Sequence, residues 1–432
     1  MQRPNIEKIG VMDQLMVWTV YKGFPTVIQA TIDLADSVDV DVLKAAVESN
    51  LKVFPNFRNK PVVHKNRFYF MENSGEAPVF EETDKRKDLC TADTNGYSFY
   101  VTYEDKKIHF VIAHFLSDGT GMKLFVSYVK KCYLRDRYPG EYEFDEAEAM
   151  NKSHFEDIID PVDLFEQKLN SKDKKDVYRP KKGAFYVSGP FDPDGDSRLV
   201  VSMAEEDIAK LAKGLGVTPV AIMTTVFNTA LKKVYNLENE NIVSAAMVDI
   251  RRRARIFPLR NFSGVAYMPV NSDDLKSDLR EECKAAGKRL KKSLKSADFG
   301  VGNQKKLVKV FNLIPGSLNT RLSLAKKIIG DAAQGILSYT ISYLREGRPS
   351  DWERSKVLDE TYEIIQATTN SPFAAMFSYR GVETWEFFCL AEKEKMGKAI
   401  VETLSEMGIE CEVTERVVRL KCSFDLDRIE TV

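Results

Sequence analysis

The sequence predicts an α/β (α+β) fold built as two lobes, and three observations carry that prediction. The length of 432 residues exceeds what one ordinary hydrophobic core holds. Short β-branched segments alternate with segments of helical periodicity in both halves of the chain. Between the halves, residues 138–185 are acidic and then lysine-rich without sustained periodicity, which is typical of a linker. We therefore expect a first lobe over 1–185, including that linker, and a second lobe over 186–432.

Each half contains its own run of predicted elements. Pro55 ends the first predicted helix, because a proline ring cannot continue it. The first half is predicted to contain a strand at 27–34, a helix at 39–54, hairpins at 61–71 and 97–113, and a helix at 119–135. The second half is predicted to contain strands at 198–203, 242–249, 265–270, 336–344, 373–379, 385–390 and 416–422, with helices at 204–213, 218–235, 275–294 and 392–407.

The composition narrows the class of protein. Hydrophobic residues make up 44% and charged residues 29% of the chain, which is the ordinary globular range. The 63 basic and 64 acidic residues nearly cancel, so the net charge gives no reason to expect a nucleic-acid partner. No apolar run approaches the roughly 20 residues of a transmembrane helix. The six cysteines have no zinc-type spacing, so no metal is implied, and we expect a cytoplasmic protein.

His114 ends the most apolar predicted strand, in the stretch IHFVIAHFLSDGTG. Phe110, Ile112 and His114 share one strand face by the period of two, so the imidazole lies at the end of an apolar wall. Partial desolvation keeps an imidazole neutral and able to accept a proton near neutral pH. The alternative is a histidine that serves only the core. Asp118, four residues on, is well placed to cap the following helix.

The His-x-x-x-Asp-Gly pattern at 114–119 resembles the active-site motif of the chloramphenicol acetyltransferase-like superfamily. That superfamily includes plant BAHD acyltransferases, alcohol acetyltransferases and the condensation domains of peptide synthetases. Three further segments, 42–58, 209–235 and 249–264, are similar to family segments in order and spacing. The resemblance therefore covers most of the chain.

The resemblance implies a two-lobed CoA-dependent acyltransferase fold. Each lobe would be a mixed sheet flanked by helices, with an active-site tunnel between the lobes. His114 would be the general base that takes a proton from an alcohol or amine as it attacks an acyl thioester. Acyl-CoA would be the donor substrate, acetyl being one candidate acyl group, with no permanently bound cofactor and no covalent acyl-enzyme.

The resemblance also assigns structural roles around the motif. Asp118 and Gly119 would shape the turn, with Asp118 paired to an arginine instead of to the histidine. Arg58, Arg251 and Arg252 are the candidates for that arginine, and the sequence alone does not choose among them. The pair would be buried, so losing it would damage folding.

Three more residues are candidates for the site. Asn261 lies in an Asn-Phe-x-Gly turn that is similar to a family turn, and we expect a structural role for it. Ser342 and Ser378 lie on predicted late strands and are candidate substrate-binding residues. The Ser-Asn-x-Gly strand end of many relatives is absent at Ser342, which leaves an oxyanion donor from that strand unsupported.

Three alternatives stay open. The acyl donor could be carried on the phosphopantetheine arm of an acyl carrier protein, although Ala113 replaces the second histidine that condensation domains usually have. The chain could be a non-catalytic binding protein on the same fold, or an unrelated two-domain α/β protein. A coenzyme A donor requires basic residues at the donor mouth, whereas a carrier protein requires a docking surface.

Overall fold

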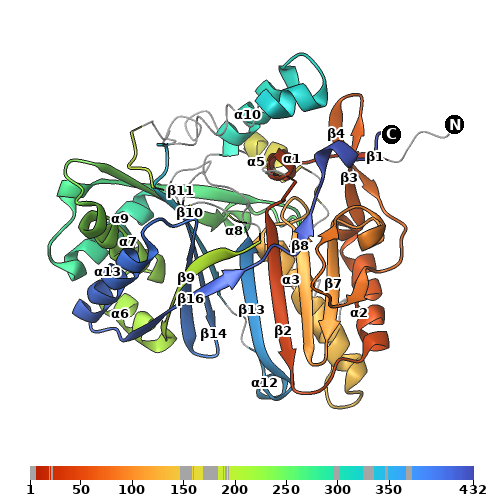
Figure 1. The fold of residues 1–432 in the computed structure, drawn as a ribbon, viewed down its shortest axis with the longest axis horizontal. Coiled ribbons are helices and arrows are strands. Elements are labelled where there is room, and N and C mark those ends of the chain that lie inside the picture. Colours follow the sequence, from red (N-terminus) through yellow and green to blue (C-terminus); the bar gives the residue numbers. More distant parts are fainter. Residues whose placement is uncertain are drawn as a thin grey trace.

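The computed structural model describes residues 6–18, 20, 23–145, 158, 160–168, 183–187, 189, 192, 194–295, 301–324, 335–345, 349–365 and 372–432. Figure 1 shows two lobes side by side, each with its own sheet and covering helices. The predicted α/β fold class is confirmed. Most of the predicted linker lies outside the described residues, and the tunnel between the lobes stays a prediction.

The sheet of the first lobe has the strand order β13-β2-β8-β7-β5. Neighbours along β2, β8 and β7 are antiparallel, and β2 and β8 align Val27 with Ala113. Helices α2 and α3 pack against each other beside this sheet (Figure 1). The bounds are β2 Val27–Leu34, α2 Val40–Val53, β5 Val79–Glu81, β7 Phe99–Glu104, β8 Lys107–Ala113, α3 Gly119–Arg137 and β13 Val357–Ile365.

Strand β13 comes from the second half of the chain but belongs to the first sheet. It pairs antiparallel with β2, and Tyr362 lies opposite Ala30 (Figure 1). The sequence did not predict this strand. The sheets show that a strand from the second half of the chain completes the first lobe. The division of the chain into lobes at residue 185 stays a prediction.

The sheet of the second lobe has the strand order β11-β10-β12-β14-β15-β9-β16. Helices α6, α7, α9 and α13 lie together on one side of it (Figure 1). The strands are β9 Asp196–Ala204, β10 Asn241–Asp249, β11 Ser263–Asn271, β12 Tyr339–Arg345, β14 Phe373–Tyr379, β15 Val382–Phe388 and β16 Cys411–Val418. The helices are α6 Glu205–Leu215, α7 Pro219–Tyr235, α9 Leu279–Ser293 and α13 Lys393–Glu406.

Smaller elements surround the two sheets. The C-terminal segment returns to the first lobe, where Thr431 bridges to Val63. The bounds are β1 Ile6–Lys8, α1 Val11–Trp18, β3 Asn59–His64, β4 Arg67–Glu72, β6 Lys87–Asp88, α5 Pro161–Lys168, α8 Arg251–Ala254, α10 Val301–Leu313, α12 Asp351–Lys356 and β17 Cys422–Ser423.

Most predicted elements have bounds in the structure that differ by a few residues, and two of them differ most. The helix predicted from 275 begins at Leu279, because the Asp278 side chain accepts hydrogen bonds from two backbone N–H groups and caps it there. The strand predicted at 416–422 is β16, which ends at Val418, followed by the short β17.

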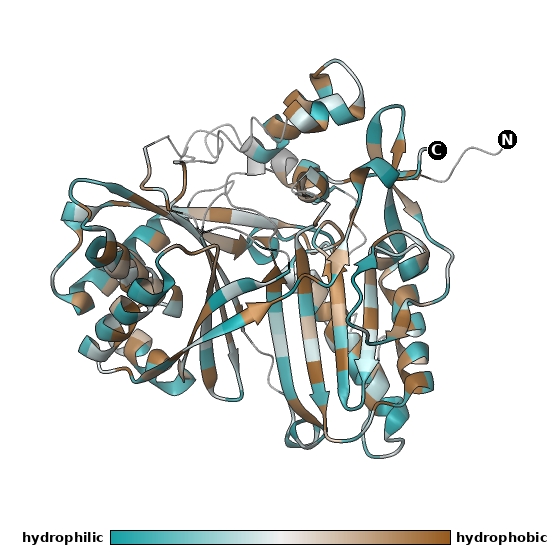
Figure 2. Ribbon diagram, in the orientation of Figure 1, coloured by the Kyte–Doolittle hydropathy of each residue, from teal (hydrophilic) through white to brown (hydrophobic). Residues whose placement is uncertain are grey.

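Each lobe has its own core. In the first, Phe57 and Phe125 stack with ring centroids 4.0 Å apart, and in the second Phe227 and Phe387 stack at 4.9 Å. Figure 2 shows both apolar and hydrophilic residues along β2 and β13. Among the described residues no single helix is long and apolar enough to cross a membrane, and α6 with α7 reaches that length only as a pair bent by 96°.

Candidate active site

His114 directly follows β8. Its backbone N–H donates to the carbonyl oxygen of Thr26 at 2.9 Å, which continues the pairing of β2 and β8 by one residue. Ala113 and Phe115 on either side are buried, whereas His114 is partly exposed. The strand therefore delivers the imidazole at its end, as the sequence predicted, on a residue that is only partly exposed.

Asn261 holds the imidazole at the Nδ1 edge of the ring. The Asn261 amide nitrogen donates to Asp13 Oδ1 at 2.8 Å and to the carbonyl oxygen of His114 at 2.8 Å. Both partners are acceptors, so the amide nitrogen must face them and the amide oxygen must face the ring. That oxygen lies 3.0 Å from His114 Nδ1 and accepts a hydrogen bond from the Nδ1–H group. Nε2 therefore carries the lone pair in the neutral ring.

The pKa of His114 is lowered below its ordinary value. Burial is the main cause, since it disfavours the charged imidazolium. The hydrogen bonds to its own carbonyl and to Asn261, and the charge of Asp118, act in the opposite direction without cancelling burial. The imidazole is therefore neutral at neutral pH, which is the form that can accept a proton.

Asp118 caps helix α3 and points at Arg251. Its Oδ1 accepts from the Gly121 N–H at 3.1 Å, and its Oδ2 accepts from the Phe262 N–H at 2.8 Å. Two parallel bonds of 2.9 Å join the carboxylate to the Arg251 guanidinium. Burial alone would raise the pKa of Asp118, but Arg251 and the two N–H donors hold it below its usual range. Asp118 stays ionised and fixes the turn after His114.

All five N–H groups of the buried Arg251 guanidinium have acceptors. Besides Asp118, Nε donates to the Pro258 carbonyl at 2.9 Å. Nη1 donates to Asp249 at 3.2 Å, and Nη2 donates to the Arg260 carbonyl at 2.9 Å. The arginine thus ties the turn after β8 to the loop before β11.

The structure places the other two candidate arginines elsewhere. Arg58 donates to Glu48 at 2.7 Å and to the Tyr97 hydroxyl at 3.4 Å. Arg252 is exposed on α8. The possibility that Arg58 or Arg252 pairs with Asp118 is therefore wrong, since Arg251 occupies both carboxylate oxygens.

Two glycines let the chain segments approach at the motif. A side chain on Gly119 would begin 3.1 Å from Leu344 Cδ2 on β12, so β12 packs directly on the start of α3. A side chain on Gly121 would collide with Ser117 Oγ and with the Leu259 carbonyl oxygen. The sequence indicated Gly119 as part of the motif but gave no sign that Gly121 is sterically required.

Asp13 is a site residue that the sequence did not reveal. It lies on α1, its exposed fraction is 1%, and it bonds Asn261. Its one visible signal is a carboxylate inside the mostly apolar stretch VMDQLMVW.

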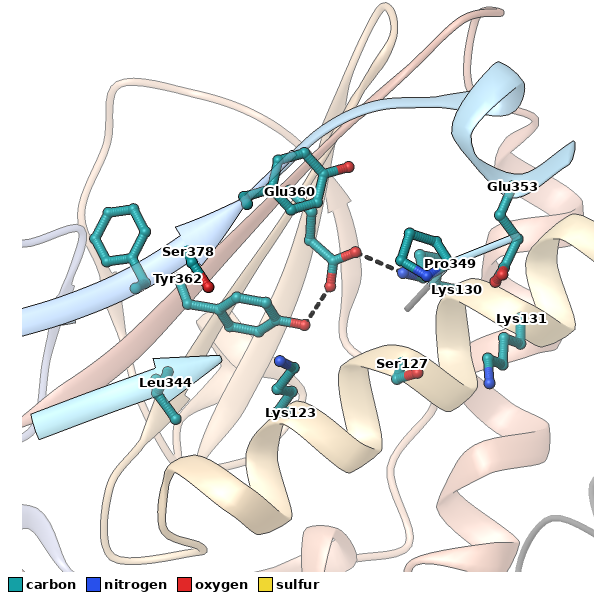
Figure 3. Close-up of a pocket in the computed structure, with 12 residues that line it drawn as sticks. Lys123, Ser127, Lys130, Lys131, Leu344, Pro349, Glu353, Glu360, Tyr362 and Ser378 are labelled. Carbon is teal, nitrogen blue, oxygen red and sulfur yellow. Dashed lines mark hydrogen bonds and ion pairs between the residues drawn. The ribbon is translucent and has the colours of Figure 1, made fainter. Parts of the chain in front are cut away.

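A cavity of about 120 Å³ lies between α3 and the strands β12, β13 and β14 (Figure 3). Ser378 lines it, whereas neither Ser342 nor His114 does. Its lining residues are Lys123, Ser127, Lys130, Lys131, Leu344, Pro349, Glu353, Glu360, Tyr362, Phe377, Ser378 and Tyr379. Because Leu344 contacts both the cavity and Gly119, this cavity begins beside the His-x-x-x-Asp-Gly turn.

The cavity is lined by lysines on the α3 side. Glu360 accepts from Lys130 and from the Tyr362 hydroxyl (Figure 3). Burial would raise the pKa of Glu360, but Lys130 and the Tyr362 hydroxyl hold it below its usual value. Lys123 lies over the Tyr362 ring, with Nζ 5.6 Å from the centroid. The wall from α3 therefore carries three lysines, and the carboxylates of Glu353 and Glu360 line the cavity opposite it. Within the described ranges, no group of histidine, cysteine or acidic side chains could hold a metal ion.

The chain resembles solved structures although no protein-family model and no curated protein sequence matches it. Trichothecene 15-O-acetyltransferase from Fusarium sporotrichioides is 13% identical, with a TM-score of 0.62 over 92% of this chain and 94% of that one. The starter condensation domain of rhizomide synthetase, in complex with C8-CoA and Leu-SNAC, is 11% identical, with a TM-score of 0.61 over 93% of each chain. Polyketide synthase associated protein 5 from Mycobacterium tuberculosis is 12% identical, with a TM-score of 0.59 over 92% of this chain and 97% of that one.

These similarities establish the fold. The chain has the chloramphenicol acetyltransferase-like fold, in which condensation domains and acetyltransferases share one architecture. The fold that the resemblance of the His-x-x-x-Asp-Gly stretch implied is therefore confirmed.

Proposed function

We propose that the protein is an acyltransferase that moves an acyl group from acyl-CoA to an alcohol or amine, with His114 as general base. The observation that carries this proposal is the orientation of the imidazole. Asn261 accepts a hydrogen bond from the Nδ1–H group, so the lone pair of the neutral ring is on Nε2. The lowered pKa of His114 keeps the ring neutral. A neutral, oriented imidazole is the group that acyl transfer to a hydroxyl or amine requires.

In the proposed reaction, Nε2 takes the proton of the acceptor as its oxygen or nitrogen attacks the thioester carbonyl. The tetrahedral intermediate collapses, the carbon–sulfur bond breaks, and the imidazolium returns the proton to the departing thiolate. The products are the ester or amide and free coenzyme A, and no acyl-enzyme is formed. Asn261 keeps accepting from Nδ1 throughout and so stabilises the transient imidazolium.

The lysine-lined cavity supports coenzyme A as the donor. Lys123 and Lys131 line it from α3 and could approach the phosphates of the nucleotide. The rhizomide starter condensation domain binds C8-CoA, and the Fusarium protein is an acetyltransferase. We therefore assign this cavity to the phosphate-bearing part of the donor.

A donor carried by an acyl carrier protein is the second candidate. The similarity to condensation domains favours it, and Ala113 in place of a second histidine favours the free-standing acyltransferase. The intact Asp13–Asn261–His114 connections argue against a protein that keeps the fold for binding alone.

The test is release of free thiol from a series of acyl donors with and without a panel of alcohols and amines. Acetyl-CoA, longer acyl-CoAs and an acylated carrier protein would be compared at equal concentration. We expect acceptor-dependent thiol release from an acyl-CoA. Release from the carrier protein alone would replace the donor assignment, and acceptor-dependent release from no donor would contradict the proposed function.

A further inference from the structure

Asp13 lies behind the active-site histidine, on the far side of Asn261. Its Oδ1 accepts from the Asn261 side-chain nitrogen at 2.8 Å and from the Asn261 backbone N–H at 3.3 Å. Both side chains are buried, with exposed fractions of 1% each. Asp13 therefore contacts both the backbone and the amide group of the residue that holds His114.

These contacts determine which end of the Asn261 amide faces the ring. If the amide rotated by half a turn, its oxygen would face the Asp13 carboxylate and the His114 carbonyl, and both of those are acceptors. Its nitrogen would then face Nδ1, which would have to give up its proton. The proton would move to Nε2 and occupy the position that takes a proton from the acceptor. Asp13 thus disfavours the imidazole tautomer that cannot act as base.

Asp13 also lies beside a buried cation. Arg260 Nη1 lies 3.7 Å from Oδ2, and the same guanidinium also pairs with Glu7 and lies 4.9 Å over the Phe70 ring. Burial raises the pKa of Asp13 to about 7, against the opposing effects of Arg260 and Asn261. A carboxyl oxygen accepts from the Asn261 amide in either protonation state, so the observed contact persists when Asp13 is protonated. The ionised form is the one that cannot donate to a rotated amide, and the His114 carbonyl disfavours the rotated amide in both states.

We propose that Asp13 is a positioning residue that fixes the amide of Asn261 and thereby holds His114 in the tautomer with its proton on Nδ1. The proposal rests on the proposed function of His114 as general base. It distinguishes Asp13 from Asp118, which is joined to Arg251 and shapes the turn after the histidine.

The test is ¹⁵N spectroscopy of the full chain labelled at histidine, combined with steady-state kinetics. The chain has four histidines, so the His114 signals are assigned by their loss in His114→Ala. We expect wild-type His114 with a protonated Nδ1 and a bare Nε2. Asp13→Ala should give a mixture of tautomers and lower kcat by about tenfold to a hundredfold with KM for the donor nearly unchanged. Asp13→Asn, which still offers an acceptor oxygen, should restore the wild-type spectrum and most of kcat.

A wild-type His114 with its proton on Nε2 would overturn the proposal without any variant. A folded Asp13→Ala that kept the wild-type tautomer and kcat would overturn it as well. If Asp13→Ala does not fold, Asp13→Leu fills the volume of the carboxylate without accepting hydrogen bonds and is held to the same criteria. The His114 tautomer could change with the Asp13 variants as predicted while the protein shows no transferase activity. That result would retain the positioning role of Asp13 and contradict the proposed function.

Discussion

Asn261 binds both the side chain and the backbone of His114. Its amide oxygen lies 3.0 Å from Nδ1, and its amide nitrogen donates to the carbonyl oxygen of the same histidine at 2.8 Å. The ring cannot turn about its Cα–Cβ bond without breaking the first contact, and the second holds the backbone from which it projects. One side chain from the second half of the chain therefore sets the orientation of the histidine that follows β8.

Replacing Asn261 with alanine should lower kcat by about tenfold to a hundredfold, because the imidazole loses the acceptor that fixes its tautomer. The matched control is Asn56→Ala. Asn56 is also buried and donates to the Leu116 carbonyl at 3.3 Å, two residues beyond His114, without contacting the ring. Steady-state kinetics of the two folded variants would separate the roles. Equal losses of kcat would indicate that any disturbance of this loop suffices.

The activity should depend on pH through His114 in one direction. Its pKa is lowered from 6.5 by burial, so the ring is neutral above that lowered value and protonated below it. We expect kcat/KM to be constant around neutral pH and to fall only as the pH drops through the lowered pKa of His114, on the acid side of 6.5. Asp13, with a pKa of about 7, is the other group near the ring that titrates in this range, and Asp13→Asn removes its titration. If kcat/KM of Asp13→Asn already decreases on acidification from pH 7 or above, the assignment of the base to His114 is contradicted.

Removing Arg251 should destabilise the protein strongly. Arg251→Met leaves the buried Asp118 carboxylate without its partner, which costs about 3–5 kcal/mol of unfolding free energy. Arg252→Met, on the exposed neighbour, should change stability by no more than about 0.5 kcal/mol. Urea unfolding at pH 7 measures both.

The contribution of this pair also has a defined pH dependence. The pKa of Asp118 is lowered in the folded state, so the stabilisation is fully present above the unfolded pKa near 4 and is lost as the pH falls through the lower folded value. The difference between wild type and Arg251→Met should therefore persist at pH 7 and shrink in acid below about pH 4. A difference that is small at pH 7 would contradict the buried pair.

Gly121 should not tolerate a side chain. Alanine there would collide with Ser117 and Leu259, and relieving that collision requires backbone movement that costs about 1–3 kcal/mol. Gly214→Ala is the matched control, because Gly214 lies in α6 with nothing within 4 Å of the added carbon. That change should stabilise the protein by about 0.5–1 kcal/mol. Thermal unfolding of both variants measures the difference, and a neutral Gly121→Ala would contradict the close packing of α3 on the loop before β11.

Local patterns predicted most of the fold. The apolar stripe of α3 and the alternation along β8 have periods that specify a helix and a strand without reference to distant residues. Strand β13 was missed because its burial does not alternate regularly and a bulge separates Val357 from Asp359. Its place beside β2 depends on a pairing between residues more than 300 positions apart, which no local pattern encodes.

The site was predictable only where residues stand close together in the sequence. His114, Asp118 and Gly119 form one motif, but the sequence could not choose Arg251 over Arg252, because two adjacent arginines differ only in the direction in which a four-residue helix turns them. Asp13 could not be predicted, since nothing in the sequence links α1 to the turn at Asn261.

The most direct measurement of the central claim compares acceptor-dependent thiol release in His114→Ala and His109→Ala. His109 lies on β8, five residues before His114, where its ring is hydrogen-bonded to the Thr31 hydroxyl at 3.0 Å, and it serves as the matched control. We predict that His114→Ala, verified as folded, loses about a hundredfold to ten-thousandfold in kcat while His109→Ala stays near the wild-type value. A folded His114→Ala that retained wild-type turnover would contradict the assignment of His114 as the general base.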